Sequence, residues 1–324
     1  MRMDAFHYSA YGLCLESNSH LQGLAPCGRV KVADVCIAIE DGEQFPAAPT
    51  ETIYYVSDWL DHGSGDPGLV IYRSTEDGSY LFRYAEGVEF HIAADSTRIA
   101  ARFASHSSLV DLTSFLTGPV LGFVLRMRGV IALHACAIDV GGRAIMLVGD
   151  AFAGKSTTAV MFARMGCAVL TEDVAPLCVE GGAIAVHSGC PEVALRPQAV
   201  KYLFGSADAL PRFSDNWEKR RLDLAQTGAF SHRSLPVAAI YVLTNHDSVP
   251  DAPCVRPMSS GEAMVELLAN IYANRLFHRE LRLRELDMVH RVARTIPVKE
   301  GVTGGWSRPV ERFCEVVLGD VRAS

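Results

Sequence analysis

Apolar and polar residues alternate in short runs along the first hundred residues of the chain. The runs are FHYSAYGLCLE, RVKVADVCIAIE, LVIYRS, YLFRYA and VEFHIAA, and turn-forming clusters such as DHGSGDPG separate them. Short alternating runs bounded by glycine, proline and aspartate are typical of β-strands joined by turns. This pattern predicts a small β-rich N-terminal domain over residues 1–106.

The pattern changes at residues 107–128, where SLVDLTSFLTGPVLGFVLRM carries apolar residues at helical spacing. Helical spacing predicts a helix, and Pro119 is expected to kink or divide it. We interpret residues 107–128 as a helical connector, which leaves residues 129–324 for a second, larger domain.

The second domain mixes strand and helix patterns. VIALHACAIDV and AIMLVGD flank a turn at Gly141-Gly142 and predict a hairpin. A helix over residues 155–165 and the strand CAVLTED then complete a predicted βαβ unit. APLCVE and AIAVHSG predict another hairpin, VAAIYVLT a buried strand, and GEAMVELLANIYANRL a helix opened by Ser259-Ser260. The fold class is therefore α/β, with a polar, irregular and potentially functional connection over residues 205–234.

Charge, cysteine spacing and the length of apolar runs indicate which partners the protein binds and in which compartment it lies. A net charge of −7 argues against a nucleic-acid or anionic-membrane surface, because both partners need positive charge. The nine cysteines are odd in number and form no CxxC pair, so the spacing indicates neither a disulfide framework nor a zinc site. About 18 uninterrupted apolar residues would be needed to cross a membrane, and no such run is present. We expect a cytoplasmic protein.

A phosphate-binding loop motif follows the strand AIMLVGD. The motif is G-x-x-x-x-G-K-[ST], and its residues are Gly149, Asp150, Ala151, Phe152, Ala153, Gly154, Lys155 and Ser156. In such loops, backbone N–H groups surround the phosphates, the lysine adds charge at the β and γ oxygens, and the serine hydroxyl is placed for Mg²⁺. The helix predicted over residues 155–165 follows, so a plain glycine turn is the weaker alternative, and Thr157 in its first turn is a further candidate contact to the nucleotide. The motif predicts ATP and Mg²⁺ as cofactors.

Two acids, Glu172 and Asp173, stand at the end of the strand that follows this helix. Ligands of α/β sheets gather at the carboxyl ends of the strands, so the acids are expected near the phosphates. One acid can hold Mg²⁺ and the other can take the proton of an attacking hydroxyl. A solvated acidic turn is the alternative without function.

The run LHACAIDVGGRAIMLVGDAFAGKSTTAVMFARMGCAVLTED resembles the catalytic core of HPr kinase/phosphorylase without a gap from Leu133 to Asp173. The resemblance implies a phosphoenolpyruvate-carboxykinase-type P-loop core. It also implies that Glu172 is the catalytic acid–base group, that His134 adjusts its ionisation, and that Asp173 assists it or the metal. His134 taken alone would more often be a core histidine.

The sequence departs from this family at several positions. Ala151 and Phe152 stand where the family has Ser-Gly, and Glu172 replaces its first aspartate. The glycine-rich signature for phosphorolysis is missing, and GCPEVALRPQAV stands in its place. These departures put the phosphate-dependent reverse reaction in doubt.

The same departures point to a subfamily, because the chain also resembles the HPr-kinase-like proteins found with lasso-peptide maturation enzymes. YSAYGLCLES, EKRRLDL and LLANIYANRL carry this looser likeness, together with the segment from Pro191 to Pro197. It implies an ATP-dependent serine kinase whose partner is a precursor peptide, phosphorylated at its C-terminal serine. HPr kinases are hexamers, so a homo-oligomer is a further expectation.

Three basic residues, Arg196, Lys219 and Arg220, are candidate substrate contacts, because guanidinium and ammonium groups suit phosphoryl and carboxylate groups. A solvated charged face is the alternative for the run at Lys219. Three other functions stay open: a kinase of an HPr-type phosphocarrier, a non-catalytic ATP-binding regulatory module, and a small-molecule kinase or carboxykinase-like enzyme.

Overall fold

The computed structural model describes residues 5–42, 44–45, 51–61, 63–244, 251–273, 279–305 and 308–323. The chain forms two compact units. The first unit comprises the residues up to Arg128 together with Ser214–Trp217, and the second comprises Gly129–Phe213 and the residues from Glu218 onward. The helical segment expected as a connector belongs to the first unit.

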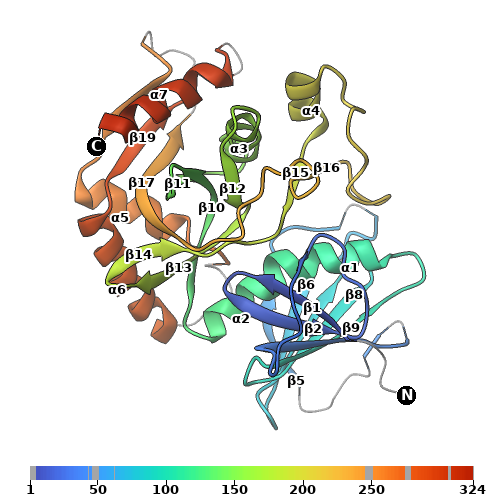
Figure 1. The fold of residues 1–324 in the computed structure, drawn as a ribbon. Helices are drawn as coiled ribbons and strands as arrows, with labels where there is room; N and C mark the ends of the chain where they lie inside the picture. Colours follow the sequence, from blue (N-terminus) through green and yellow to red (C-terminus); the bar gives the residue numbers. More distant parts are fainter. Residues whose placement is uncertain are drawn as a thin grey trace. The chain divides into compact units, whose positions relative to one another are not determined.

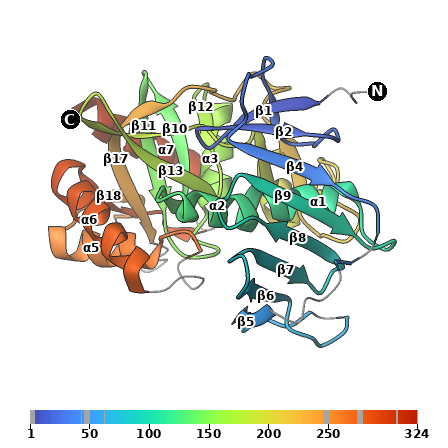
Figure 2. The same ribbon diagram turned by 90° about the horizontal axis from the view of Figure 1, so that it is seen from below.

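The first unit is built on a nine-stranded sheet whose strand order is β3-β1-β2-β4-β9-β8-β7-β6-β5. Figure 2 shows the strands from β9 to β5 following one another across this sheet. The strands are β1 (Phe6–Ala10), β2 (Leu13–Ser17), β3 (Ala25–Pro26), β4 (Val35–Ile39), β5 (Glu51–Val56), β6 (Leu69–Ser74), β7 (Tyr80–Tyr84), β8 (Val88–Ile92) and β9 (Arg98–Phe103). All five predicted strand runs lie in this sheet, while β3, β5 and β9 were not predicted.

The helical segment packs on this sheet through aromatic rings. It consists of α1 (Leu109–Phe115), the π-helix η1 (Leu116–Val120), which contains Pro119, and α2 (Leu121–Met127). The Phe123 ring lies 4.9 Å from the rings of Tyr80 and Phe82. The segment Leu109–Met127 is long and apolar enough to cross a membrane by length and composition, and 67% of its most apolar 18-residue window is buried inside the structure.

The second unit contains an eight-stranded sheet whose main path is β11-β10-β13-β14-β17-β19-β18. Its strands are β10 (Ile131–Val140), β11 (Arg143–Val148), β12 (Ala168–Thr171), β13 (Val174–Glu180), β14 (Ala183–Val186), β17 (Leu235–Thr244), β18 (Cys254–Pro257) and β19 (Val298–Val302). The predicted hairpins β10–β11 and β13–β14 and the predicted buried strand β17 are confirmed.

The two strands of the predicted βαβ unit run parallel to each other, as predicted, but they are not neighbours in the sheet. The two strands that flank its helix do not pair with each other, because β10 lies between them and is antiparallel to both. Strand β11 instead pairs in parallel with β17. Strand β10 of the hairpin β10–β11 therefore lies between the two strands that the helix connects.

Helices cover both faces of this sheet (Figure 1). They are α3 (Lys155–Arg164), α4 (Pro197–Phe204), α5 (Ser260–Ala269), α6 (Arg279–Thr295) and α7 (Val310–Ala323). Alternate residues of β10 point to opposite faces, as the strand period requires. Cys136 and Ile138 join the core that contains α3, α4 and α7, whereas Ala135 and Ala137 join the core that contains α5 and α6.

The polar segment 205–234 is more ordered than the sequence predicts. Strand β16 (Arg220–Asp223) pairs with β15 (Glu192–Leu195) in a separate two-stranded sheet. The predicted helix opened by Ser259-Ser260 is α5, which ends at Ala269, and residues 274–276 of its quoted run lie outside the described residues.

Candidate active site

The phosphate-loop sequence joins the end of β11 to the start of α3, as predicted. The backbone conformation of the loop explains both of its glycines. Gly149 has φ 147°, and a Cβ there would lie 3.0 Å from the carbonyl oxygen of Leu243. Gly154 caps α3 with φ 95°, a left-handed conformation that glycine adopts without strain. Phe152 also has a positive φ, 70°, which is rare for a bulky residue. The loop conformation is therefore tightly specified.

Lys155 is buried and folds back over the loop. Its Nζ donates hydrogen bonds to the carbonyl oxygens of Gly149 at 2.6 Å and Asp150 at 3.1 Å. The charge of the lysine is thus held inside the ring of loop residues, where it faces any anion that the loop binds.

Ser156 connects the loop to the acids. Its hydroxyl donates a hydrogen bond of 2.6 Å to Oε1 of Glu172. The acids were expected near the phosphate loop, and Glu172 is in direct contact with Ser156 of that loop. A hydroxyl and a carboxylate at this position are oxygen ligands of the kind that Mg²⁺ prefers.

The two acids lie at a break in the strand pairing along one side of β10. Both β12 and β13 pair with β10, and Glu172 and Asp173 lie between them. The Val174 N–H donates to the Glu172 carbonyl at 2.8 Å, and Asp173 has φ 69°. This is the hydrogen-bond pattern of a γ-turn, which is rare with a positive φ at its centre. Strained backbone of this kind is frequent at active sites, and here it separates the two acidic side chains from the regular ladder.

Asp173 accepts hydrogen bonds from two sides. Its Oδ1 lies 3.0 Å from Nε2 of His134, and its Oδ2 accepts a 3.1 Å hydrogen bond from the Tyr272 hydroxyl. The backbone fixes this arrangement, because the His134 N–H donates to the Asn270 carbonyl beside Tyr272. Tyr272 falls in the run LLANIYANRL, where it was expected to be an exposed or capping residue of a helix without a catalytic role, since no motif marks it.

The surroundings shift the pKa values of the two acids in opposite directions. Burial first, and then the charge of Asp173, raises the pKa of Glu172 to about 7, although the Ser156 hydrogen bond opposes this rise. Burial also disfavours the charge of Asp173, but the hydrogen bond and charge of His134 outweigh it and hold the pKa of Asp173 below its ordinary value. Glu172 therefore gains and loses its proton near neutral pH, whereas Asp173 stays ionised there.

The three candidate substrate residues have different surroundings. The positive charge of Lys219 lowers the pKa of both acids, so Lys219 lies within electrostatic reach of them. Arg196 is exposed, and its guanidinium lies 4.4 Å from the centre of the Phe152 ring. Arg220 is buried, and it bonds to Asp208 at 2.6 Å and to two backbone carbonyls. Arg220 therefore has a structural role.

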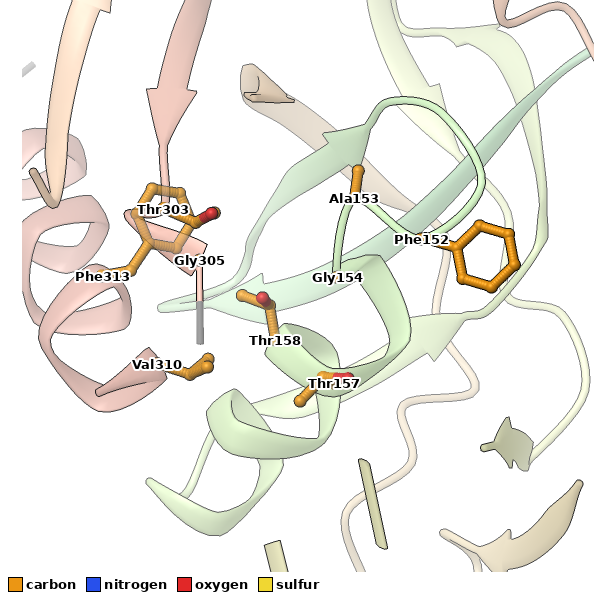
Figure 3. Close-up of a pocket in the computed structure, with 9 residues that line it drawn as sticks. All are labelled: Phe152, Ala153, Gly154, Thr157, Thr158, Thr303, Gly305, Val310 and Phe313. Carbon is orange, nitrogen blue, oxygen red and sulfur yellow. The ribbon is translucent and has the colours of Figure 1, made fainter. Parts of the chain in front are cut away.

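A pocket lies beside the loop (Figure 3). Its lining includes Ala153 and Gly154 of the loop and six residues beyond it, which are Thr157, Thr158, Thr303, Gly305, Val310 and Phe313. Phe152 also borders the pocket, but Figure 3 shows its ring on the far side of the loop from Phe313. The ring of Phe152 is 76% exposed. An apolar pocket with a few hydroxyl groups next to a phosphate-loop sequence suits the nucleoside part of a nucleotide.

The residues present fit ATP and Mg²⁺. The loop and the first turn of α3 direct backbone N–H groups toward an anion, because the first N–H groups of a helix have no partner within it. Ser156 and Asp173 supply oxygen donors for a hard cation.

No protein-family model matches the chain, and neither does any curated protein. Among solved structures, the chain is similar to the HPr(Ser) kinase/phosphatase from Coxiella burnetii, with a TM-score of 0.36 and 12% sequence identity. The similarity covers 59% of this chain and 90% of that chain. A likeness at this level assigns no activity, so the functional argument depends on the site itself.

Proposed function

We propose that the protein is an ATP- and Mg²⁺-dependent kinase that phosphorylates a hydroxyl group. The observation that carries this proposal is the hydrogen bond between Ser156 of the phosphate-loop sequence and Glu172, whose pKa is raised to about 7. A base that titrates near the working pH is the most effective proton acceptor for a hydroxyl nucleophile. A loop that only bound nucleotide would need no such base.

Each residue has a distinct role in this mechanism. When bound, Mg²⁺–ATP supplies the phosphoryl group, and Ser156 and Asp173 would hold the cation. Glu172 accepts the proton of the acceptor hydroxyl as its oxygen attacks. Lys155 and the loop N–H groups stabilise the negative charge that spreads over the transferred group. His134 and Tyr272 hold the Asp173 carboxylate in place and ionised.

For the acceptor, we propose a serine in a peptide, with the C-terminal serine of a lasso-peptide precursor as the first candidate. The support is the subfamily resemblance of the sequence together with the positions of Lys219 and Arg196. A terminal carboxylate beside the acceptor serine would find positive charge at Lys219, within reach of the base.

The test is incubation of the purified protein with Mg²⁺–ATP and two acceptors in parallel, a lasso precursor ending in serine and an HPr-type carrier. Intact mass and fragmentation then locate any added phosphate. Phosphate on the terminal serine supports the full proposal, and phosphate on the carrier alone supports the kinase but refutes the peptide acceptor. ATP binding without transfer to any peptide or carrier, and without ATP consumption, would favour the regulatory-module alternative.

A further inference from the structure

Three side chains with metal-binding atoms meet on the hairpin β13–β14, away from the acids described above. Cys178 and Glu180 lie on β13, two residues apart and therefore on the same face, and His187 follows the end of β14. Their ligand atoms all lie within 4.8 Å of one another. Cys178 lies five positions after Asp173 along the strand, about 16 Å at the usual rise, so this cluster is distinct from the candidate active site.

The distances within the cluster suit a tetrahedral ion. Sγ of Cys178 lies 3.4 Å from Oε1 of Glu180, and Nδ1 of His187 lies 3.9 Å from the same oxygen. The bond lengths of zinc to sulfur, nitrogen and oxygen place the ligands of a tetrahedral site about 3.4–3.6 Å apart. The third pair, Sγ of Cys178 and Nδ1 of His187, lies within 4.8 Å, so a movement of up to about 1 Å in the His187 ring would bring the three atoms to tetrahedral separations.

The surrounding backbone holds the ligands in place. The His187 N–H donates to the Pro176 carbonyl at 3.1 Å, and Cys178 is paired with Ala185 across the hairpin. The Ser234 hydroxyl donates a 2.9 Å hydrogen bond to Oε1 of Glu180. A hydrogen bond from a neighbouring group to a ligating carboxylate is the usual support of a metal site.

We propose that Cys178, Glu180 and His187 bind a Zn²⁺ ion. Thiolate, imidazole and carboxylate are the three ligand types that zinc takes in proteins, and mixed sets of three with water in the fourth position are typical of open zinc sites. The Glu180 side chain is 52% exposed, so the ion reaches the site from solvent. The spacing of the cysteines gave no sign of zinc, because only one ligand is a cysteine and the hairpin brings the three together.

A zinc ion here would add a cross-link between the two strands of the hairpin, which are joined by their turn and by strand pairing. Strand β14 pairs with β17 through only two residue pairs, and Ser234 immediately precedes β17. The ion would tie both strands of the hairpin together at the point where β14 meets β17. We therefore expect Zn²⁺ to stabilise the fold of the second unit.

The experiment is a titration of the metal-free full-length protein with Co²⁺, a spectroscopic substitute for Zn²⁺, followed by displacement with Zn²⁺. We expect one equivalent of Co²⁺ to give a thiolate-to-metal charge-transfer band, and one equivalent of Zn²⁺ to remove it. Cys178→Ser should abolish the band, and His187→Ala and Glu180→Gln should each weaken binding at least tenfold. The thermal unfolding temperature should rise with Zn²⁺ in the wild type and not in Cys178→Ser.

Matched controls separate this site from others. Cys254→Ser changes another half-buried cysteine on a strand and should leave the band intact. Glu180→Gln changes an exposed side chain, so it keeps the test valid if Cys178→Ser fails to fold. The proposal is overturned if no charge-transfer band appears, or if metal binding survives in Cys178→Ser and is lost instead in Asp173→Asn.

Discussion

Glu172 and Asp173 are neighbours in the chain, and the residues around them divide their roles. Asp173 has two hydrogen-bond partners, His134 and Tyr272, that favour its charged form. The Glu172 side chain accepts a hydrogen bond from the Ser156 hydroxyl, and the charge of Asp173 opposes its ionisation. Two acids whose environments push their pKa values apart are a common arrangement for proton transfer, in which the carboxyl of raised pKa is the one that exchanges the proton.

Glu172→Gln is expected to reduce kcat by roughly 10² to 10⁴, because the amide keeps the size of the side chain but cannot accept the proton. ATP binding should persist, since the loop and Lys155 are unchanged. Steady-state kinetics with the identified acceptor measure the first effect, and nucleotide titration measures the second. Glu218→Gln, a change at an exposed glutamate, is the control. Full transfer by Glu172→Gln would remove this residue from the mechanism.

The pH dependence of kcat/KM follows from the same pKa. A base works only when it is ionised, so activity should rise as the pH passes through about 7 and fall below it. Lys219→Met removes a positive charge that lowers the pKa of Glu172, so the midpoint should move to higher pH. Lys201→Met, at an exposed lysine on α4, should not move it. A midpoint that moves downward in Lys219→Met contradicts this electrostatic assignment.

The sequence could predict the acids but not all of their partners. Glu172, Asp173 and the loop share one short stretch of chain, and periodicity places them at the end of a strand. Tyr272 comes from a segment almost a hundred residues later, and only the tertiary fold brings its hydroxyl to Asp173. Lys219 and Arg220 are adjacent in one basic run, yet only the fold distinguishes the lysine near the acids from the buried arginine.

At the scale of elements, the hairpin β10–β11 explains how the site is built. Strand β10 pairs with β11 on one edge and with both β12 and β13 on the other. The loop after β11 and the acids between β12 and β13 are therefore two strands apart, which lets Ser156 reach Glu172. Local patterns predicted each of these strands, but pairing order depends on long-range contacts that periodicity does not contain.

Gly149→Ala tests the junction between β11 and the loop. The new Cβ would lie 3.0 Å from the Leu243 carbonyl oxygen and would need a backbone φ of 147°. We expect a loss of about 1–3 kcal/mol in the free energy of unfolding, together with weaker ATP binding. Chemical denaturation and nucleotide titration measure the two effects.

Gly261→Ala is the matched control for this change. Gly261 lies in the first turn of α5, and a Cβ there meets nothing within 4 Å. Alanine is favoured over glycine in helices, so this variant should be as stable as the wild type or slightly more so. If both variants behave alike, the close approach to Leu243 does not constrain the loop.

At the scale of the whole molecule, the candidate active site and the proposed zinc site belong to the second unit. Every residue assigned to them lies in Gly129–Phe213 or after Glu218. The first unit has its own sheet and its own core, with α2 packed on β7 through Phe123 and α1 packed on β7 through Phe115. Units with separate cores can unfold in separate transitions, so a ligand of one unit should stabilise that unit alone.

Mg²⁺–ATP is therefore expected to raise one of two unfolding transitions in differential scanning calorimetry. At a ligand concentration of 100 Kd the stabilisation should be about 2.7 kcal/mol. Lys155→Ala should abolish this effect, because it removes the charge held inside the loop, while Glu172→Gln should retain it. A shift that persists in Lys155→Ala would mean that nucleotide binds elsewhere, and a shift lost in both variants would mean that Glu172 serves binding rather than proton transfer.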